Sequence, residues 1–492
     1  MTPQVAPTMP WEPDLVRLAV RGRVTVRVRP GTTYDDIATN RDVNLGAQVA
    51  SARLDGGGLD QLLRRYSPAV RATRVYTSAR GGLRPGYGHL GWDDDEQRLG
   101  MSHTFRLDLD PASPLLAVSD ALQQLDVVES VSPCYLCQAP FGFAARRQDV
   151  VPGDHSVFDR VGAGRALAME PGDTTVVIGI VDSGVALMHP ELMAAVRPGA
   201  DTVDLDDDLV SRGLKLVGDT RGRDRHPEDE MGHGTGCASI VGARGARVHP
   251  GLGGAARVLP LRALARAQKI DQQEPTAIGS IQDIDAAVKL GVDLGARVLN
   301  LSFGTPKSAL RPGDPLPHAD VVKYALSRGC VLVAASGNSG DAALYYPAAL
   351  PGVIAVGSVN AQGHPSGFSC RGPHVALSAP GERVPCAGLQ GYQENTGTSF
   401  AAPFVAAAAA LLIARGNRNS TPLTASEIKE ILMKSASPFP RHAEVEGFGS
   451  GVLDVPTALR LVDQATRDPP GLEGPSSGFS ESRGSPGALR PL

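Results

Sequence analysis

An apolar run in the C-terminal third of the chain constrains the fold more than any other feature. Residues 397–403 read Gly-Thr-Ser-Phe-Ala-Ala-Pro, and residues 404–413 are apolar without a break. Alanine-rich runs favour a helix, and a helix that is apolar on every side belongs inside a large core. Ser399 then lies at the helix N-terminus, where backbone N–H groups lack intrahelical partners. It is either a helix cap or a nucleophile whose oxyanion those N–H groups hold.

The composition limits which partners, cellular location and cysteine chemistry we expect. The chain has 492 residues, of which 42% are hydrophobic and 20% charged, and its net charge is −4. This charge gives no reason to expect nucleic acid or a membrane as a partner. The first residues do not form a basic segment followed by an apolar one, and no apolar run reaches about 18 residues, so we expect a cytoplasmic protein, with secretion as the alternative. The six cysteines are too scattered for a disulfide framework, and we expect thiols.

The first 137 residues contain a compact β-α-β pattern. We predict a strand at 104–109, a helix at 115–125 and a second strand at 127–131. An earlier strand is predicted where Val24, Val26 and Val28 alternate with Arg23 and Arg27. We expect its basic face to be solvated, with a nucleic-acid-binding stripe as the alternative.

Two cysteines follow this unit in a Cys-Tyr-Leu-Cys motif. Cys134 and Cys137 have the spacing of a redox pair or of half a zinc site. No second such pair lies nearby in the sequence, so we favour ordinary packing residues.

Beyond residue 155 the sequence changes to alternating apolar strands and helices. Residues 175–181 form a continuous apolar run, which predicts a strand buried on both faces of a parallel sheet. Further strands are predicted at 256–261, 296–301, 330–335 and 353–357, and helices at 234–243, 279–290 and 317–328. This alternation predicts an α/β domain with a mostly parallel central sheet and helices on both faces. Ligands of such sheets bind beyond the carboxyl ends of the strands.

Three residues at the ends of these elements have the chemistry of nucleophilic catalysis. Asp182 ends a buried strand, His233 begins a helix in Gly-His-Gly-Thr-Gly, and Ser399 begins another. A serine hydroxyl needs a base such as histidine, and a buried carboxylate fixes the tautomer of that histidine. Asn338 follows the strand 331–334 and is either an ordinary turn residue or a donor to an oxyanion.

These motifs together resemble those of the subtilisin-like serine proteases, or subtilases. The resemblance covers about residues 155–463 and rests on four motifs in the family's order: Val181-Asp182-Ser183-Gly184, Gly232-His233-Gly234-Thr235, Ser336-Gly337-Asn338 and Gly397-Thr398-Ser399-Phe400-Ala401-Ala402-Pro403. It implies a subtilisin-like fold, a catalytic triad of Asp182, His233 and Ser399, and an oxyanion hole that includes Asn338.

The resemblance also implies a substrate and a reaction. It implies a serine endopeptidase that hydrolyses polypeptides through an acyl-enzyme and requires no cofactor or metal. The alternatives are a maturation protease dedicated to one partner and a pseudoprotease that binds peptides without cutting them. The residues expected to bind the substrate are Leu301, Ser302, Phe303, Gly304, Ala335, Ser336 and Gly337.

The resemblance to the subtilases also implies a domain organisation. Residues 1–137 resemble the α+β propeptide domain of subtilases, which implies an intramolecular inhibitor and a self-processing zymogen. We expect a linker with the self-cleavage site at 138–155, the peptidase domain at 156–463 and a disordered tail rich in Pro, Gly and Ser at 464–492.

Two further features leave alternatives open. Cys237 lies one helical turn after His233 and is either a small packing residue or a thiol sensitive to oxidation and mercury. Acidic residues cluster between 201 and 208, where a solvated loop is expected and calcium binding is the alternative. These residues are Asp201, Asp204, Asp206, Asp207 and Asp208.

Overall fold

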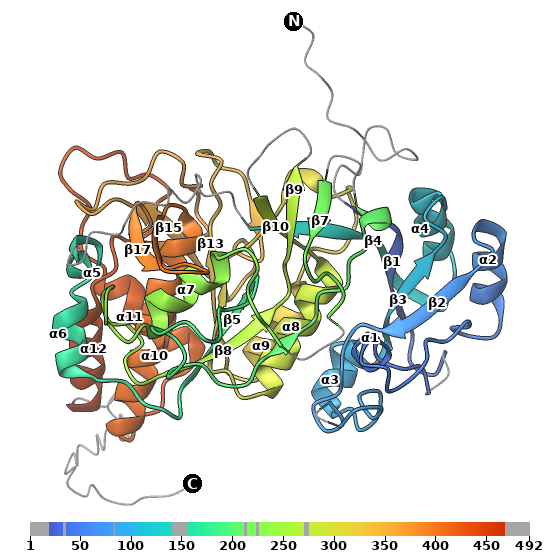
Figure 1. Cartoon of the computed structure of the whole chain (residues 1–492), viewed down its shortest axis with the longest axis horizontal. Coiled ribbons are helices and arrows are strands. Elements are labelled where there is room, and N and C mark those ends of the chain that lie inside the picture. The colour runs from blue at the N-terminus through green and yellow to red at the C-terminus, as the bar shows by residue number, and fades with distance from the viewer. Residues whose placement is uncertain are drawn as a thin grey trace, which may run out of the picture.

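A computed structural model describes residues 19–32, 36–82, 84–139, 155–210, 214–222, 226–269 and 275–467. Most of the expected linker and of the expected C-terminal tail lies outside these residues. Figure 1 shows the N-terminal part at one end of an elongated molecule and the peptidase part at the other, with α8 and α9 between them.

The centre of the larger part is a seven-stranded sheet in which every pair of neighbouring strands is parallel. This confirms the predicted parallel sheet, and the long predicted strand is β5 (Val177–Asp182), which is buried throughout. The strands in spatial order are β16 (Val375–Pro380), β15 (Ile354–Val359), β13 (Val331–Ala335), β11 (Val298–Leu301), β5, β8 (Arg257–Arg262) and β6 (Ala200–Asp201).

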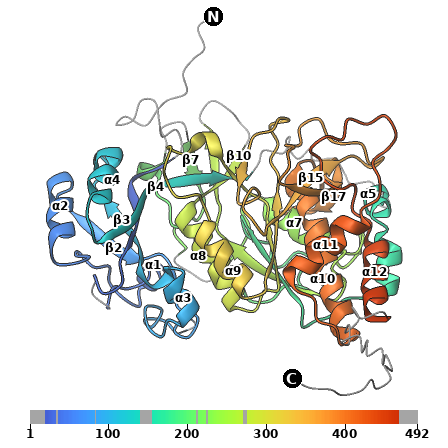
Figure 2. The same cartoon turned by 180° about the vertical axis from the view of Figure 1, so that it is seen from behind.

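Helices cover both faces of this sheet, as predicted (Figure 2). Residues of β5 alternate between two hydrophobic cores, since Ile178 belongs to one and Val177 to the other. The first core is covered by α5 (Ser156–Arg160), α6 (Ala163–Met169), α7 (His233–Gly242), α10 (Thr398–Arg418), α11 (Ala425–Ser435) and α12 (Val455–Arg467). The second core is covered by α8 (Ile281–Asp293) and α9 (Ala319–Ser327).

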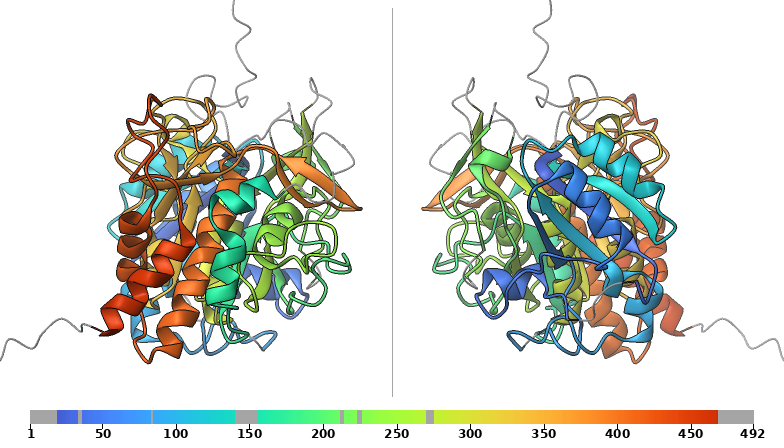
Figure 3. Two further views of the ribbon diagram at one scale, coloured as in Figure 1. Left: turned by 90° about the vertical axis from the view of Figure 1, so that its left-hand side faces the viewer. Right: turned by 90° about the vertical axis from the view of Figure 1, so that its right-hand side faces the viewer.

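The predicted apolar helix is α10, and it passes through the middle of the first core (Figure 3, left). Among the described residues it is the one helix long and apolar enough to cross a membrane, but 94% of that apolar window is buried inside the molecule. The surrounding helices α7, α11 and α12 pack against it. Burial in the protein core therefore accounts for the apolar surface of α10.

A second, antiparallel sheet joins the two parts of the chain, which the sequence did not predict. Its N-terminal strands are β2 (Val70–Arg74), β3 (Thr104–Leu109), β1 (Ala19–Val28) and β4 (Val128–Gln138). The sheet continues into the peptidase part with β10 (Pro275–Ser280), β9 (Ala265–Lys269) and β7 (Leu214–Val217). β4 is much longer than the predicted strand at 127–131, because its second half pairs with β10.

The remaining elements are short. The N-terminal helices are α1 (Asn40–Asn44), α2 (Gly58–Tyr66), α3 (Asp94–Arg98) and α4 (Leu115–Gln123). Two small hairpin-like pairs lie in the peptidase part: β12 (Thr305–Pro306) with β14 (Tyr345–Tyr346), and β17 (Val384–Ala387) with β18 (Tyr392–Asn395). The β17–β18 pair projects from the molecule in Figure 3.

One prediction for the N-terminal part is wrong, and the prediction that its two cysteines are ordinary packing residues is confirmed. The basic face of β1 is not solvated: Arg23 is 1% exposed and Arg27 forms an ion pair with Asp320 of α9. Cys134 and Cys137 are not paired, and each is buried in a different hydrophobic core. Residues three apart on a strand point to opposite faces, so this spacing cannot bring the two thiols together on β4.

Candidate active site

Asp182 and His233 form the first contact of the site. The Nδ1 atom of His233 lies 2.7 Å from the Oδ1 atom of Asp182, and the aspartate side chain is fully buried. Burial alone would lower the pKa of His233, but the nearby charge and hydrogen bond of Asp182, together with Asp229, raise that pKa above its ordinary value. The Nε2 atom of His233 is buried and has no hydrogen-bond partner among the described residues. It is therefore placed to exchange a proton with a group that enters the site.

Asp229 holds the start of the helix that carries His233, and sequence reasoning missed it. Its buried carboxylate accepts hydrogen bonds from the backbone N–H groups of Gly232 and Thr235 and from the Ser183 hydroxyl. These bonds satisfy N–H groups at the N-terminus of α7 and connect that helix to the end of β5. An acidic residue four positions before the histidine, just ahead of a predicted helix, was the available signal.

Ser399 lies in the first turn of α10, fully buried. Pro403 has no N–H group to offer to the carbonyl four residues earlier, so the Ser399 carbonyl is free of its usual helical bond. That carbonyl instead accepts hydrogen bonds from the Ser302 hydroxyl at 2.8 Å and the Cys237 thiol at 3.4 Å. The Ser399 hydroxyl in turn donates to the Ser302 carbonyl at 3.3 Å. Ser302 thus contacts both the backbone carbonyl and the side-chain hydroxyl of Ser399. The sequence did not reveal this role.

Asn338 lies beside the start of α10. Its Oδ1 atom accepts hydrogen bonds from the backbone N–H of Thr398 at 2.9 Å and from the Thr398 hydroxyl at 2.8 Å. Because the amide oxygen is engaged in this way, the orientation of the amide group is fixed next to Ser399. The preceding residues Ala335, Ser336 and Gly337 form the end of β13 and the turn that leads to Asn338.

The end of β4 pairs with β10 and with a residue that follows β11. Gln138 and Gly304 exchange backbone hydrogen bonds of 3.4 and 3.0 Å, and the N–H of Ala139 donates to the carbonyl of Ala277 at 3.0 Å. The chain segment thus runs as an extended strand between β10 and the residues that follow β11. Of the residues expected to bind substrate, Gly304 does pair with an extended strand, and that strand comes from the same chain.

Ser302 and Phe303 come just before Gly304, which pairs with Gln138 of β4. Ser302 contacts Ser399 directly, and Leu301 is the last residue of β11. The strand pairing at Gly304 therefore lies two residues from the residue that contacts Ser399.

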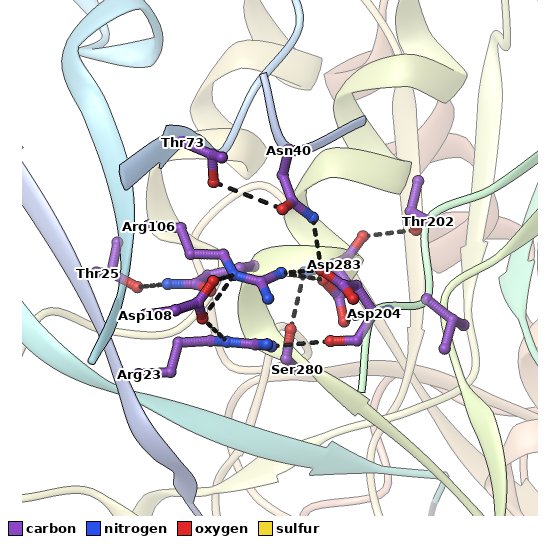
Figure 4. Close-up of polar contacts among 12 residues, drawn as sticks. Arg23, Thr25, Asn40, Thr73, Arg106, Asp108, Thr202, Asp204, Ser280 and Asp283 are labelled. Carbon is purple, nitrogen blue, oxygen red and sulfur yellow. Dashed lines mark hydrogen bonds and ion pairs between the residues drawn. The ribbon is translucent and has the colours of Figure 1, made fainter. Parts of the chain in front are cut away.

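The solvated acidic loop expected between 201 and 208 is found only in part, because Asp207 and Asp208 are exposed whereas the other three aspartates form ion pairs with arginines. Asp201 pairs with Arg262, Asp204 with Arg106 (Figure 4) and Asp206 with Arg221. Carboxylates that are already paired with guanidinium groups are poorly suited to coordinate calcium. Calcium binding stays a prediction of the sequence.

At the catalytic site, Asp182, His233 and Cys237 each place one potential metal-ligand atom within 4.8 Å of the others.

A parallel sheet with a serine at a helix N-terminus and a buried Asp182–His233 contact at the end of β5 are the features of a subtilisin-like serine peptidase. The family model of the subtilases, Peptidase_S8, matches residues 173–451, which is more than half of the 492 residues. The chain belongs to the subtilase family.

Individual relatives agree with this assignment. A thermophilic serine proteinase of Bacillus sp. (strain AK1) is 35% identical over 246 residues, which are 49% of this chain and 53% of that protein. The chain thus spans about half the length of this relative. Thermitase of Thermoactinomyces vulgaris is 32% identical over 253 residues, which are 51% of this chain and 79% of thermitase. The solved structure of the prenylagaramide maturation protease PagA covers 61% of this chain and 98% of its own, with 24% identity and a TM-score of 0.47.

Proposed function

We propose that this protein is a serine endopeptidase made as a zymogen, in which its own N-terminal domain blocks the cleft until the linker is cut. The observation that carries the proposal is the end of β4, which pairs as an extended strand with β10 and with Gly304, two residues after Ser302.

The chemistry follows from the contacts of the site. The Ser399 hydroxyl turns from the Ser302 carbonyl to the Nε2 atom of His233, which takes its proton as the oxygen attacks the peptide carbonyl. The charge of Asp182 stabilises the imidazolium that forms. The amide group of Asn338 and the N–H of Ser399 donate to the oxyanion. His233 then returns the proton to the leaving amine, and water hydrolyses the acyl-enzyme by the same steps in reverse.

The inhibitory role of the N-terminal domain is supported by how its last residues are held. Cys137 is fully buried, and Ala139 is 5% exposed. Backbone pairing with β10 and Gly304 uses the donors and acceptors that an extended substrate would need. Another peptide cannot add a strand at the same place while β4 occupies it.

The proposal is tested by comparing the wild type with Ser399→Ala on an unstructured protein substrate, and by labelling both with an active-serine phosphonate. We expect the wild type, once its linker is cut, to hydrolyse the substrate and to carry the label on Ser399. Ser399→Ala should do neither while keeping the same melting temperature. Wild-type protein that binds peptides but never reacts with the phosphonate would instead be a peptide-binding pseudoprotease.

The breadth of the substrate range is tested with the same protein. A panel of unrelated unfolded proteins should all be cut if the enzyme is a general endopeptidase. A dedicated maturation protease would leave the panel intact and cut a single partner.

A further inference from the structure

Two short segments leave neighbouring strands at the carboxyl edge of the parallel sheet. β11 and β13 are paired along their length, and residues 302–304 follow the first strand whereas residues 336–338 follow the second. In sheets of this kind, ligands bind beyond the carboxyl ends of the strands. Whatever lies between the two segments therefore decides which groups a ligand can place there.

The ring of Tyr345 lies between these two segments. A Cβ atom on Gly337 would lie 2.5 Å from Cδ2 and 2.7 Å from Cε2 of the tyrosine, which is closer than real Cβ atoms approach. A Cβ atom on Gly304 would lie 3.1 Å from both Cβ and Cδ1 of the same residue. Each segment thus places a glycine against one edge of the ring, and the ring spans the gap from one segment to the other.

Backbone contacts hold Tyr345 in this place. Its strand β14 pairs with β12, and Pro306 lies opposite Tyr345 in that pairing. The N–H of Lys307 donates to the carbonyl of Leu344 at 2.9 Å, and the carbonyl of Tyr345 accepts from the N–H of Ala349 at 2.9 Å. The tyrosine is therefore fixed to the segment that follows Gly304, and its backbone cannot withdraw without losing these bonds.

A second side chain, that of Cys370, packs against Gly337. The N–H of Cys370 donates to the carbonyl of Gly337 at 2.9 Å, and the carbonyl of Cys370 accepts from the Ser336 hydroxyl at 3.1 Å. Its fully buried Sγ atom would lie 2.8 Å from a Cβ atom on Gly337. The space beside Gly337 is thus filled by the thiol as well as by the ring.

This filled space adjoins the bond that reacts under the proposed function. The Ser399 hydroxyl donates to the Ser302 carbonyl at 3.3 Å, and Asn338 accepts from the N–H of Thr398 at 2.9 Å. The carbonyl under attack lies between these contacts, since its oxygen receives hydrogen bonds from Asn338 and from the N–H of Ser399. The residue that carries this carbonyl, just before the cut, therefore has the two segments and the tyrosine ring beside its side chain.

We infer that Tyr345 is a specificity-determining residue, and that it restricts this enzyme to polypeptides with glycine, alanine or serine just before the cut. The inference rests on the proposed function, because it names the substrates of the same serine. Placing extra atoms in a filled space forces the surrounding groups out of their preferred conformations. Here those groups belong to paired backbone segments, so a leucine or phenylalanine side chain is rejected.

The test measures kcat/KM of the processed wild type, prepared from the full chain, on chromogenic peptides that differ only in the residue before the cut. The peptides have the form Ala-Ala-Pro-X with a p-nitroanilide leaving group, and X is glycine, alanine, serine, leucine or phenylalanine. We expect the alanine peptide to be preferred over the phenylalanine peptide about a hundred-fold or more, since several carbon atoms find no room.

Variants of Tyr345 show whether the ring sets this preference. Tyr345→Ala opens the gap and should raise the phenylalanine-to-alanine ratio of kcat/KM about a hundred-fold. Tyr345→Phe is the matched control, because it keeps the ring and should keep the wild-type ratio. A purely structural defect would lower kcat/KM for all the peptides together, so the ratio isolates the effect of the ring. If Tyr345→Ala lacks a cooperative melting transition, Tyr345→Leu replaces it and should move the ratio in the same direction about ten-fold.

Two results would overturn the inference: a wild type that prefers leucine or phenylalanine before the cut, or a folded Tyr345→Ala variant that keeps the wild-type ratio. Labelling of Ser399 by peptidyl phosphonates with a methyl or a benzyl side chain repeats the comparison without turnover, and the methyl reagent should label the wild type faster. Reaction with the wrong side-chain preference would reject this inference alone. A protein that reacts with no peptide and no phosphonate would reject the peptidase proposal and this inference with it.

Discussion

Gln138 and Gly304 are joined by two backbone hydrogen bonds, although the first belongs to the N-terminal sheet and the second to the substrate side of the peptidase domain. Gly304 lies two residues after Ser302, whose carbonyl accepts a hydrogen bond from the Ser399 hydroxyl. Under the proposed function, the substrate pairs where this strand of the N-terminal domain lies, and the inhibitor and the first substrate are then the same piece of chain.

Replacing Gln138 by proline tests that contact. Proline has no N–H to donate to the Gly304 carbonyl, and within a paired strand it removes a ladder bond. We expect Gln138→Pro to slow cutting of the linker about ten-fold, measured by gel densitometry after expression. Gln138→Ala keeps the backbone donor and should process at the wild-type rate. Equal rates for the proline and alanine variants would contradict the pairing.

Asn338→Asp separates the two functions of the asparagine amide. The aspartate keeps an oxygen that accepts from Thr398 but loses the donor that faces an oxyanion, so the fold should persist while turnover falls. The corresponding donor in subtilisin is worth about 10²–10³-fold in kcat, and we adopt that scale. Steady-state kinetics should show the loss in kcat with KM nearly unchanged. A variant with full kcat would remove Asn338 from the mechanism.

The pH dependence of activity follows from His233. The histidine acts as a base only when neutral, and its pKa is raised above the ordinary 6.5 because the effects of Asp182 and Asp229 outweigh burial. The acid limb of kcat/KM for the processed enzyme should therefore have its midpoint above 6.5. In Asp182→Asn the largest raising effect is gone, so any residual activity should persist to lower pH. An acid limb that does not move would mean that another group controls it.

Cys137 should report whether β4 is in the cleft. The thiol is fully buried and burial raises its pKa to about 12, so iodoacetamide should not label it in the uncut protein. Labelling of Cys137, located by mass spectrometry, should begin when the N-terminal domain leaves. Cys237 is buried beside Ser399 and should stay unlabelled in both states, so it serves as the internal control. Rapid labelling of Cys137 in uncut protein would show that the strand is not seated.

Much of the fold could be predicted because its signals are local. Strand β3 was predicted with the observed bounds, and α7, α8 and β5 to within three residues, since continuous apolar runs and helical spacing determine them. The contact between Asp182 and His233 was also expected, because a buried carboxylate suits a histidine base and because the two motifs resemble those of subtilases.

The parts that could not be predicted depend on contacts between distant segments. Arg23 alternates with valines as a solvated residue would, and nothing local shows that Asp108 and the carbonyl of Asp204 surround it. The second half of β4 is a strand because β10 pairs with it, and β10 lies far along the chain. The role of Ser302 arises from Pro403, which frees a carbonyl that only the folded molecule brings to the Ser302 hydroxyl.

The intact mass of purified wild type beside Ser399→Ala tests the central claim most directly. We predict that the wild type loses an N-terminal piece that ends between residues 140 and 154, and that Ser399→Ala stays full length. The new N-terminus would then also report the bond that the enzyme prefers. If Ser399→Ala were cut at the same place as the wild type, or if both stayed whole, the account of a self-processing serine peptidase would be contradicted.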